Sequence, residues 1–242
     1  MSARARWAWA GAALASAALA AQAYIPSSAS LLRRAAARVE QGPRSRKAQL
    51  SGTLTLGSAP AVAATLTLQF PLSCKLTAAG IELAVRGEAG EQQIQDDGHQ
   101  GARDLLRLAC PLIAYRGQST PAADRSLRLA AAAAGLPPDL APTSLSRLYD
   151  RVVVVLGAQP RQLDRPQLWL YKENSAPARL LARSNDGLDD LRLLQYGNPA
   201  AADLFPRVIE LWHGEARVAR FDVLETQGFR GGAEEGGDDV RD

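Results

Sequence analysis

Leucine alternates with threonine at two places in the first third of the sequence. The stretches QLSGTLTLGS (49–58) and VAATLTLQFPL (62–72) each place their leucines at every second position. Successive side chains of a β-strand point to opposite faces, so both stretches predict strands with one apolar and one more polar face. The short link GSAPA predicts that the two strands form an antiparallel pair.

Strand-like runs return in the second half of the chain. They cover residues 152–156, 167–172, 178–184, 191–197, 207–214 and 216–226, and GIELAVRGEAG (80–90) adds one near the first pair. The β-branched run 152–156 is typical of a strand buried on both faces. Close spacing and turn signals such as Asn185-Asp186-Gly187 predict a meander of antiparallel hairpins. In 167–172, Leu168 and Leu170 share one face, while Trp169 and Tyr171 share the other.

Three segments have helical character. Residues 27–43 carry an apolar stripe between capping serines and Gly42-Pro43, and 124–138 is an alanine-rich run that stops at Gly135. The third, 102–117, is a helix that Pro111 should end or kink. The order helix, strands, helices, strands predicts a mainly β (α+β) domain with helices collected on one face of an antiparallel sheet, and a sheet of this length must curl.

The first 23 residues have the form of a secretory signal peptide. Arg4 and Arg6 precede an apolar run, and Ala21-Gln22-Ala23 fits the small-x-small cleavage rule. We therefore expect export to the periplasm, with cleavage near Ala23. Residues 24–229 would form one domain, and the glycine-rich, acidic residues 230–242 would form a disordered tail.

The net charge argues against a nucleic-acid partner, and the cysteine content predicts a disulfide. Arg4 and Arg6 would leave with the signal peptide, so the net charge falls from +3 to +1, and no nucleic-acid partner is expected. Cys74 and Cys110 are the only cysteines of the chain. An exported protein with two cysteines most often joins them in a disulfide, and the alternative is two free buried thiols.

No catalytic spacing is evident in the sequence. It has no nucleophile elbow, no S-x-x-K and no phosphate-binding glycine loop. His99 beside Asp97 and the run NDGLDD (185–190) are the nearest candidates for chemistry, and polar loop residues explain both more simply. We predict no catalytic residue, no metal and no cofactor. A hydrolase built from scattered residues is the third-ranked alternative.

The sequence resembles the LolA and LolB type of periplasmic lipoprotein carriers, the outer-membrane lipoprotein localisation factors. The resemblance is carried by PQLWLYKENSAPARLL (166–181), LRLLQYG (191–197) and FPRVIELWHGEARVARFDVLET (205–226). SLLRRAAARV (30–39) and QLSGTLTL (49–56) fit more loosely. It implies a curved, incompletely closed antiparallel half-barrel, with helices forming a lid over an apolar concavity that takes lipid acyl chains.

The hypothesis that follows is a monomeric, non-enzymatic carrier of lipid or lipoprotein acyl chains toward the outer membrane, with donor and acceptor proteins as further partners. One alternate set of side chains would line its cavity. They are Leu54, Leu56, Leu66, Leu68, Phe70, Leu168, Leu170, Ile209 and Leu211 of the strands, with Leu105 and Leu106 of the lid. The alternatives are that these residues form an ordinary core, and that the chain is an envelope sensor or interaction module that binds a peptide or lipid.

Overall fold

A single antiparallel sheet of twelve strands forms the frame of the protein. The computed structural model describes residues 26–40, 45–89, 92–95, 99–115, 118–185, 187–197 and 204–230. The helices are α2 (Ser28–Glu40), α3 (Gln100–Ile113) and α4 (Thr120–Ala133). The strands are β1 (Ser45–Leu56), β2 (Val62–Gln69), β3 (Ser73–Ala78), β4 (Ile81–Arg86), β5 (Gln93–Gln95), β6 (Thr143–Leu148), β7 (Arg151–Leu156), β8 (Gln167–Tyr171), β9 (Pro177–Ser184), β10 (Gly187–Tyr196), β11 (Pro206–His213) and β12 (Ala216–Arg230).

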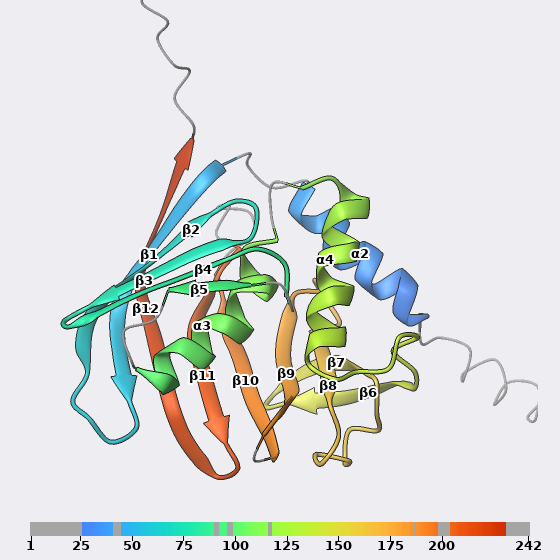
Figure 1. Cartoon of the computed structure of the whole chain (residues 1–242). Helices are drawn as coiled ribbons and strands as arrows, with labels where there is room; N and C mark the ends of the chain where they lie inside the picture. The colour runs from blue at the N-terminus through green and yellow to red at the C-terminus, as the bar shows by residue number, and fades with distance from the viewer. Residues whose placement is uncertain are drawn as a thin grey trace, which may run out of the picture.

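The strand order is β5-β4-β3-β2-β1-β12-β11-β10-β9-β8-β7-β6. Every neighbouring pair is consecutive in sequence except β1 and β12, which join an N-terminal meander to a C-terminal one. The sheet is open, with β5 and β6 at its edges, and it curls around α3 (Figure 1). The predicted fold class, an open, curved antiparallel sheet with helices on one face, is confirmed.

Helices α3 and α4 lie in the sequence between the two edge strands, whereas α2 precedes β1. After β5 the chain forms α3 and α4, and it returns at β6 on the opposite edge. Helix α3 contacts β3 and β4 of one meander and β10, β11 and β12 of the other, so it lies inside the curl. Helices α2 and α4 pack on each other beside it (Figure 1).

Three strands were missed in the sequence, and two helix boundaries differ. Strand β3 follows the turn at Pro71 and Leu72, and its two inward residues alternate with polar ones such as Lys75, so its apolar pattern is too short to recognise. Strand β5 has only three residues. Edge strand β6 has solvent on much of both faces, so it lacks a clear alternation. Helix α4 starts four residues early because Pro121 suits a first helical turn. Helix α3 continues past Pro111 to Ile113. The predicted signal peptide and residues 231–242 of the predicted tail lie outside the described residues.

Two apolar clusters occupy opposite faces of the sheet. The large one fills the concave side and includes leucines of both meanders together with the buried faces of α2, α3 and α4. The small one lies on the convex side of β7 to β9 and contains Trp169 and Tyr171. Leu168 and Leu170 belong to the first cluster, as the alternation in this strand predicted. Because β7 and β8 are apolar on both faces, they support both clusters.

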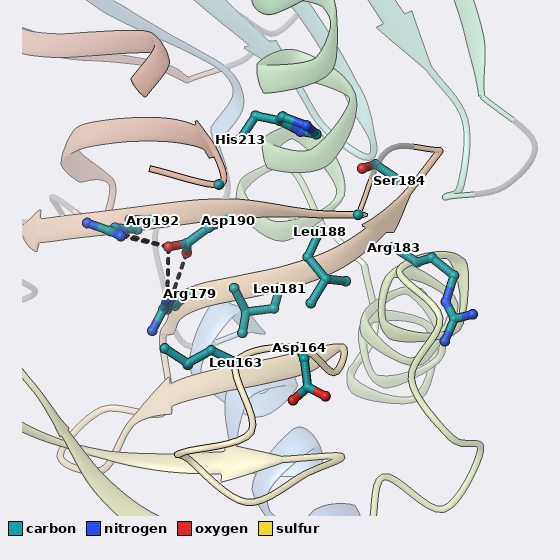
Figure 2. Close-up of a pocket in the computed structure, with 12 residues that line it drawn as sticks. Leu163, Asp164, Arg179, Leu181, Arg183, Ser184, Leu188, Asp190, Arg192 and His213 are labelled. Atoms are coloured by element: carbon teal, nitrogen blue, oxygen red, sulfur yellow. Dashed lines mark hydrogen bonds and ion pairs between the residues drawn. The ribbon is translucent and has the colours of Figure 1, made fainter. Parts of the chain in front are cut away.

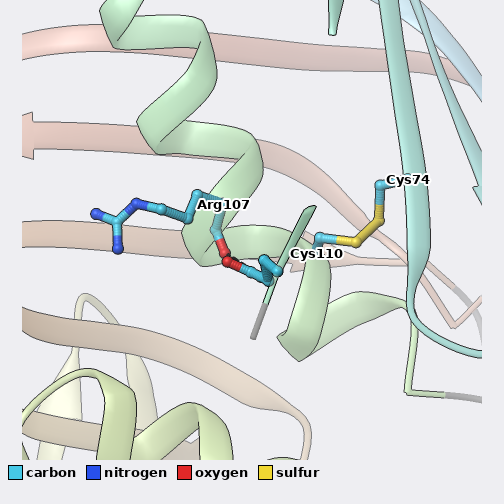
Figure 3. Close-up of a disulfide and its surroundings, with 4 residues drawn as sticks. Cys74, Arg107 and Cys110 are labelled. Carbon is cyan, nitrogen blue, oxygen red and sulfur yellow. Dashed lines mark hydrogen bonds between the residues drawn. A yellow bond between two sulfur atoms is a disulfide. The ribbon is translucent and has the colours of Figure 1, made fainter. Parts of the chain in front are cut away.

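A disulfide joins Cys74 of β3 to Cys110 of α3, as predicted, with a Cα–Cα distance of 5.9 Å. It connects the sheet to the C-terminal part of the helix, one turn beyond Arg107 (Figure 3). The backbone carbonyl of Arg107 also accepts a hydrogen bond from the side-chain amide of Gln92, at 3.0 Å. This part of α3 is therefore fixed to the N-terminal meander.

Replacing Cys74 and Cys110 together by serine should lower the free energy of unfolding. The bond closes a loop with a sequence separation of 36 residues, for which chain entropy predicts a loss of roughly 3 to 4 kcal/mol. Urea unfolding of oxidised protein and of the double variant would measure the difference. Complete thiol labelling of the unfolded wild type without reductant would contradict the bond.

Candidate functional site

The eleven predicted cavity residues come together on the concave face of the sheet. Nine of them have exposed fractions of 1% or less, and the other two, Leu56 and Phe70, are partly buried against the same cluster. Thr65 and Thr67, which alternate with the inward leucines of β2, are only partly buried. The rows predicted from alternation therefore share one face, and the side chains of α3 lie against them.

The same face includes residues that were not among the predicted cavity residues. Leu50, Leu76, Leu83, Val85, Leu180, Leu191, Leu193 and Phe221 are buried in the concave cluster, and so are Leu31 and Leu32 of α2. Alternation was visible for most of them, but their role depends on strand neighbours that the sequence does not specify. Phe221, for example, lies opposite Leu54 across the β1–β12 pairing.

A hollow of about 790 Å³ opens at one end of the concave face, beneath the first turns of α3. Its walls are the N-terminal part of α3 and the ends of the β9–β10 and β11–β12 hairpins. Leu211 and Val218 also line it, and both belong to or pack against the concave cluster. We call this hollow the mouth, because it joins the surface to the apolar interior.

Charged side chains surround the mouth. The Arg107 guanidinium of α3 lies 3.5 Å from a carboxylate oxygen of Asp104 and 3.7 Å from one of Asp189 on β10. Nδ1 of His213, the last residue of β11, lies 3.2 Å from the other oxygen of Asp189. The Arg107–Asp189 pair links the helix to the sheet where the mouth opens.

The first turn of α3 also packs directly on β12. A Cβ atom added at Gly101 would lie 3.0 Å from the carbonyl oxygen of Val218, so glycine permits the close approach. Helix α3 is thus fixed in two different ways. A covalent bond holds the part around Cys110, whereas van der Waals contact and an ion pair hold the part at the mouth.

A second hollow, of about 750 Å³, lies on the convex side of β9 and β10. Figure 2 shows Leu163, Asp164, Arg179, Leu181 and Leu188 on one side of the hairpin, and Ser184 and His213 on the other. The two hollows share Arg183, Ser184 and His213 and therefore meet at the end of this hairpin. We call the second hollow the convex groove.

Arginines and tryptophans alternate across the convex face from β8 to β12. Arg179 lies over the ring of Trp169 and donates two hydrogen bonds to Asp190, at 2.6 and 2.8 Å. Arg192 donates to the same carboxylate and lies over the ring of Trp212. The pKa of Arg192 is raised: burial would lower it, and the hydrogen bonds and charge of Asp190 outweigh that effect.

The series ends on β12. Trp212 Nε1 donates to Glu210, which accepts a 2.7 Å bond from Arg220, and Arg220 also donates two bonds to Asp222. The pKa of Arg220 is raised, mainly by its hydrogen bond to Asp222. These contacts satisfy Glu210, which is 4% exposed, and they fix the relative positions of five neighbouring strands.

The described carboxylates of the acidic run 185–190, those of Asp189 and Asp190, do not converge on one site. Asp189 points to the mouth and Asp190 to the convex groove, because consecutive strand residues face opposite sides. No group of three or more histidine, cysteine, aspartate or glutamate side chains suitable for a metal occurs among the described residues. His99 directly precedes α3, and its carbonyl accepts a backbone hydrogen bond from Arg103.

None of the helices in the described ranges combines the length and apolar character needed to cross a membrane.

No family model matches the sequence, and no curated protein matches it. Solved structures with a similar course of the chain include a putative outer membrane lipoprotein-sorting protein domain from Vibrio parahaemolyticus (11% identity, 84% of this chain and 94% of that chain, TM-score 0.49). A LolA superfamily protein from Nitrosomonas europaea aligns at 11% identity over 85% and 94%, with a TM-score of 0.41. A DUF1329 family protein from Desulfovibrio piger aligns at 10% over 86% and 96%, with a TM-score of 0.49. Similarities at this level say nothing of activity, ligand or partner, and the fold class stands on the strand order itself.

Replacing Gly101 by valine should move the first turn of α3 away from β12. The new side chain meets the Val218 carbonyl, so we expect a loss of about 1 to 3 kcal/mol and faster amide exchange in residues 100–106. Exchange around Cys110 should not change. Ala132→Val, at an exposed position of α4, controls for the helix propensity of valine. Equal exchange in both variants would contradict the close contact.

Replacing Asp190 by alanine should destabilise the convex face. Two guanidinium groups would lose their shared carboxylate in a partly buried setting, for which we expect a cost of about 3 kcal/mol. Denaturant unfolding would measure it, with the exposed Asp164→Ala as the control. A cost equal to that of the control would show that the ion pairs contribute nothing.

Proposed function

We propose that this protein binds acyl chains of lipids or lipoproteins against the concave face of its sheet and carries them through the periplasm toward the outer membrane. One observation carries the proposal: the mouth reaches Leu211, and through it a continuous apolar face built from both meanders. The signal-like first 23 residues and the resemblance of the sequence to lipoprotein carriers support the same conclusion.

Access to this face requires α3 to move. Leu105 and Leu106 are 1% exposed and lie against the strand leucines, so in the closed state the helix occupies the place of the ligand. An acyl chain would replace these contacts with its own methylenes. Burying each methylene contributes about 0.8 kcal/mol of favourable transfer free energy, so a chain of 14 methylenes contributes on the order of 10 kcal/mol. This free energy offsets the loss of the contacts that α3 makes with the sheet.

At the mouth, the N-terminal part of α3 can move away from the sheet. The disulfide and the Gln92 hydrogen bond hold the part of the helix around Cys110 to the N-terminal meander. The first turn has no covalent link to the sheet, and the Arg107–Asp189 ion pair, which lies one turn before Cys110, is at a partly exposed position. The helix would therefore pivot about its C-terminal part and expose the inward leucines from the mouth inward.

The convex groove favours a second candidate function, that of a sensor or interaction module. Leu163 is half exposed at its border, and Arg179 and Arg192 present fixed guanidinium groups beside Leu181. A partner segment that carries acidic and apolar side chains would complement this surface. Tight binding of such a peptide by protein that carries no lipid would favour this function over that of a carrier.

Native mass spectrometry of gently purified protein should show a lipid adduct that denaturation removes. Val218→Trp, which adds bulk at the apolar edge of the mouth, should lower the bound fraction severalfold by blocking entry. Leu224→Trp lies on the same strand, at a position that is 75% exposed, and should leave the adduct unchanged. Absence of lipid from the wild type, with no uptake of added fatty acid, would refute the carrier function.

A further inference from the structure

We propose that the cargo carries an anionic headgroup, and that this group takes Arg107 away from Asp189 as the tail enters. The inference rests on the proposed function and adds to it the chemical class of the ligand. The mouth is lined by three arginines and two aspartates. Arg217 lies 3.6 Å from Glu210, whereas Arg183 has no carboxylate partner among the described residues and is the cation most available to a ligand that enters there.

The two aspartates already have partners. Asp104 accepts a hydrogen bond from Gln100 and lies beside Arg107, and Asp189 lies beside both Arg107 and His213. Hydrogen-bond donors at the mouth are less well satisfied. The exposed Arg183 forms no ion pair with any described residue, and the hydroxyl of Ser184 is buried without a partner. A phosphate or carboxylate headgroup would supply acceptor oxygens for such groups.

Arg107 holds its carboxylates loosely. Its distances of 3.5 and 3.7 Å compare with 2.6 to 2.8 Å in the two-pronged Arg179–Asp190 and Arg220–Asp222 pairs of the convex face. A guanidinium group recognises a planar or tetrahedral oxyanion best when two N–H groups donate in parallel. Neither aspartate meets that condition at Arg107, so a mobile phosphate monoester can compete for it.

Exchange of the partner of Arg107 would also loosen α3. Arg107 belongs to the helix and Asp189 to β10, so a headgroup that takes the guanidinium removes the ion pair between them. Asp189 keeps His213, and Cys110 keeps its bond to β3, so neither the carboxylate nor the helix is left without support. The residue that recognises the head is then the residue whose release admits the tail.

The test compares two lysophospholipids with the same 16-carbon chain, lysophosphatidate and lysophosphatidylcholine, by displacement of the neutral dye Nile red. The wild type should bind lysophosphatidate about tenfold more tightly, the size of one charge-assisted contact. Arg107→Gln should reduce that ratio to about two or less, without weakening lysophosphatidylcholine, and Arg107→Lys should restore part of it. Arg34→Gln removes the same charge from an exposed position of α2 and should keep the full ratio.

Amide exchange supplies a readout that a purely structural role of Arg107 would not give. Lysophosphatidate should accelerate exchange in residues 100–106 of the wild type but not of Arg107→Gln, whereas millimolar inorganic phosphate should leave exchange and dye unchanged. Equal affinity for both lipids in the wild type, or a ratio that survives Arg107→Gln, overturns the inference and leaves the carrier function standing. Displacement of lysophosphatidate by inorganic phosphate at similar concentration would reveal a free-phosphate site and also overturn it. Failure of both lipids to displace the dye refutes the carrier function itself.

Discussion

The structure depends on burial of one apolar sheet face that is too long for any single helix to cover. Alternation along the strands puts leucines on the same side of both meanders, and the β1–β12 pairing makes that side continuous. Curling lets one helix, α3, contact β3 and β4 and also β10 to β12. The chain forms α3 and α4 between edge strands β5 and β6, so these two helices of the cover come from the segment that links the two edges, and α2 completes it from the N-terminal side.

The convex face differs from the concave one because it faces water and is not covered by a helix. Trp169 and Trp212 lie under Arg179 and Arg192, and Asp190 pairs with both guanidinium groups. The rings are therefore covered by charged side chains and add little apolar area to the surface. A partly buried network of ion pairs stabilises the fold only when each charged group has its hydrogen-bond partners. It holds the C-terminal meander in one shape, and on the proposed function this fixed sheet is the surface from which α3 would move.

The local period of the sequence predicted most of the sheet, because alternation and turn residues are encoded within a few neighbouring positions. It predicted the face shared by Leu168 and Leu170 and the separate face of Trp169, and the expectation of export predicted the disulfide between Cys74 and Cys110. It could not predict β6, whose solvated edge imposes no pattern, or the mouth. Arg107, Asp189 and His213 are far apart along the chain and meet only because α3 crosses the curl. Gly101 likewise gives no local sign of its packing against Val218.

The hydrophobic core and the proposed binding face consist of the same leucines, and this overlap restricts how the protein can work. A ligand gains only the difference between its own contacts and those of α3, so affinity depends on how weakly the helix is held as much as on the apolar area. The disulfide at Cys110 confines that weakness to one end of the helix. On the proposed function, a cover held covalently at Cys110, and only by packing and an ion pair nearer the mouth, would open without unfolding the sheet that it protects.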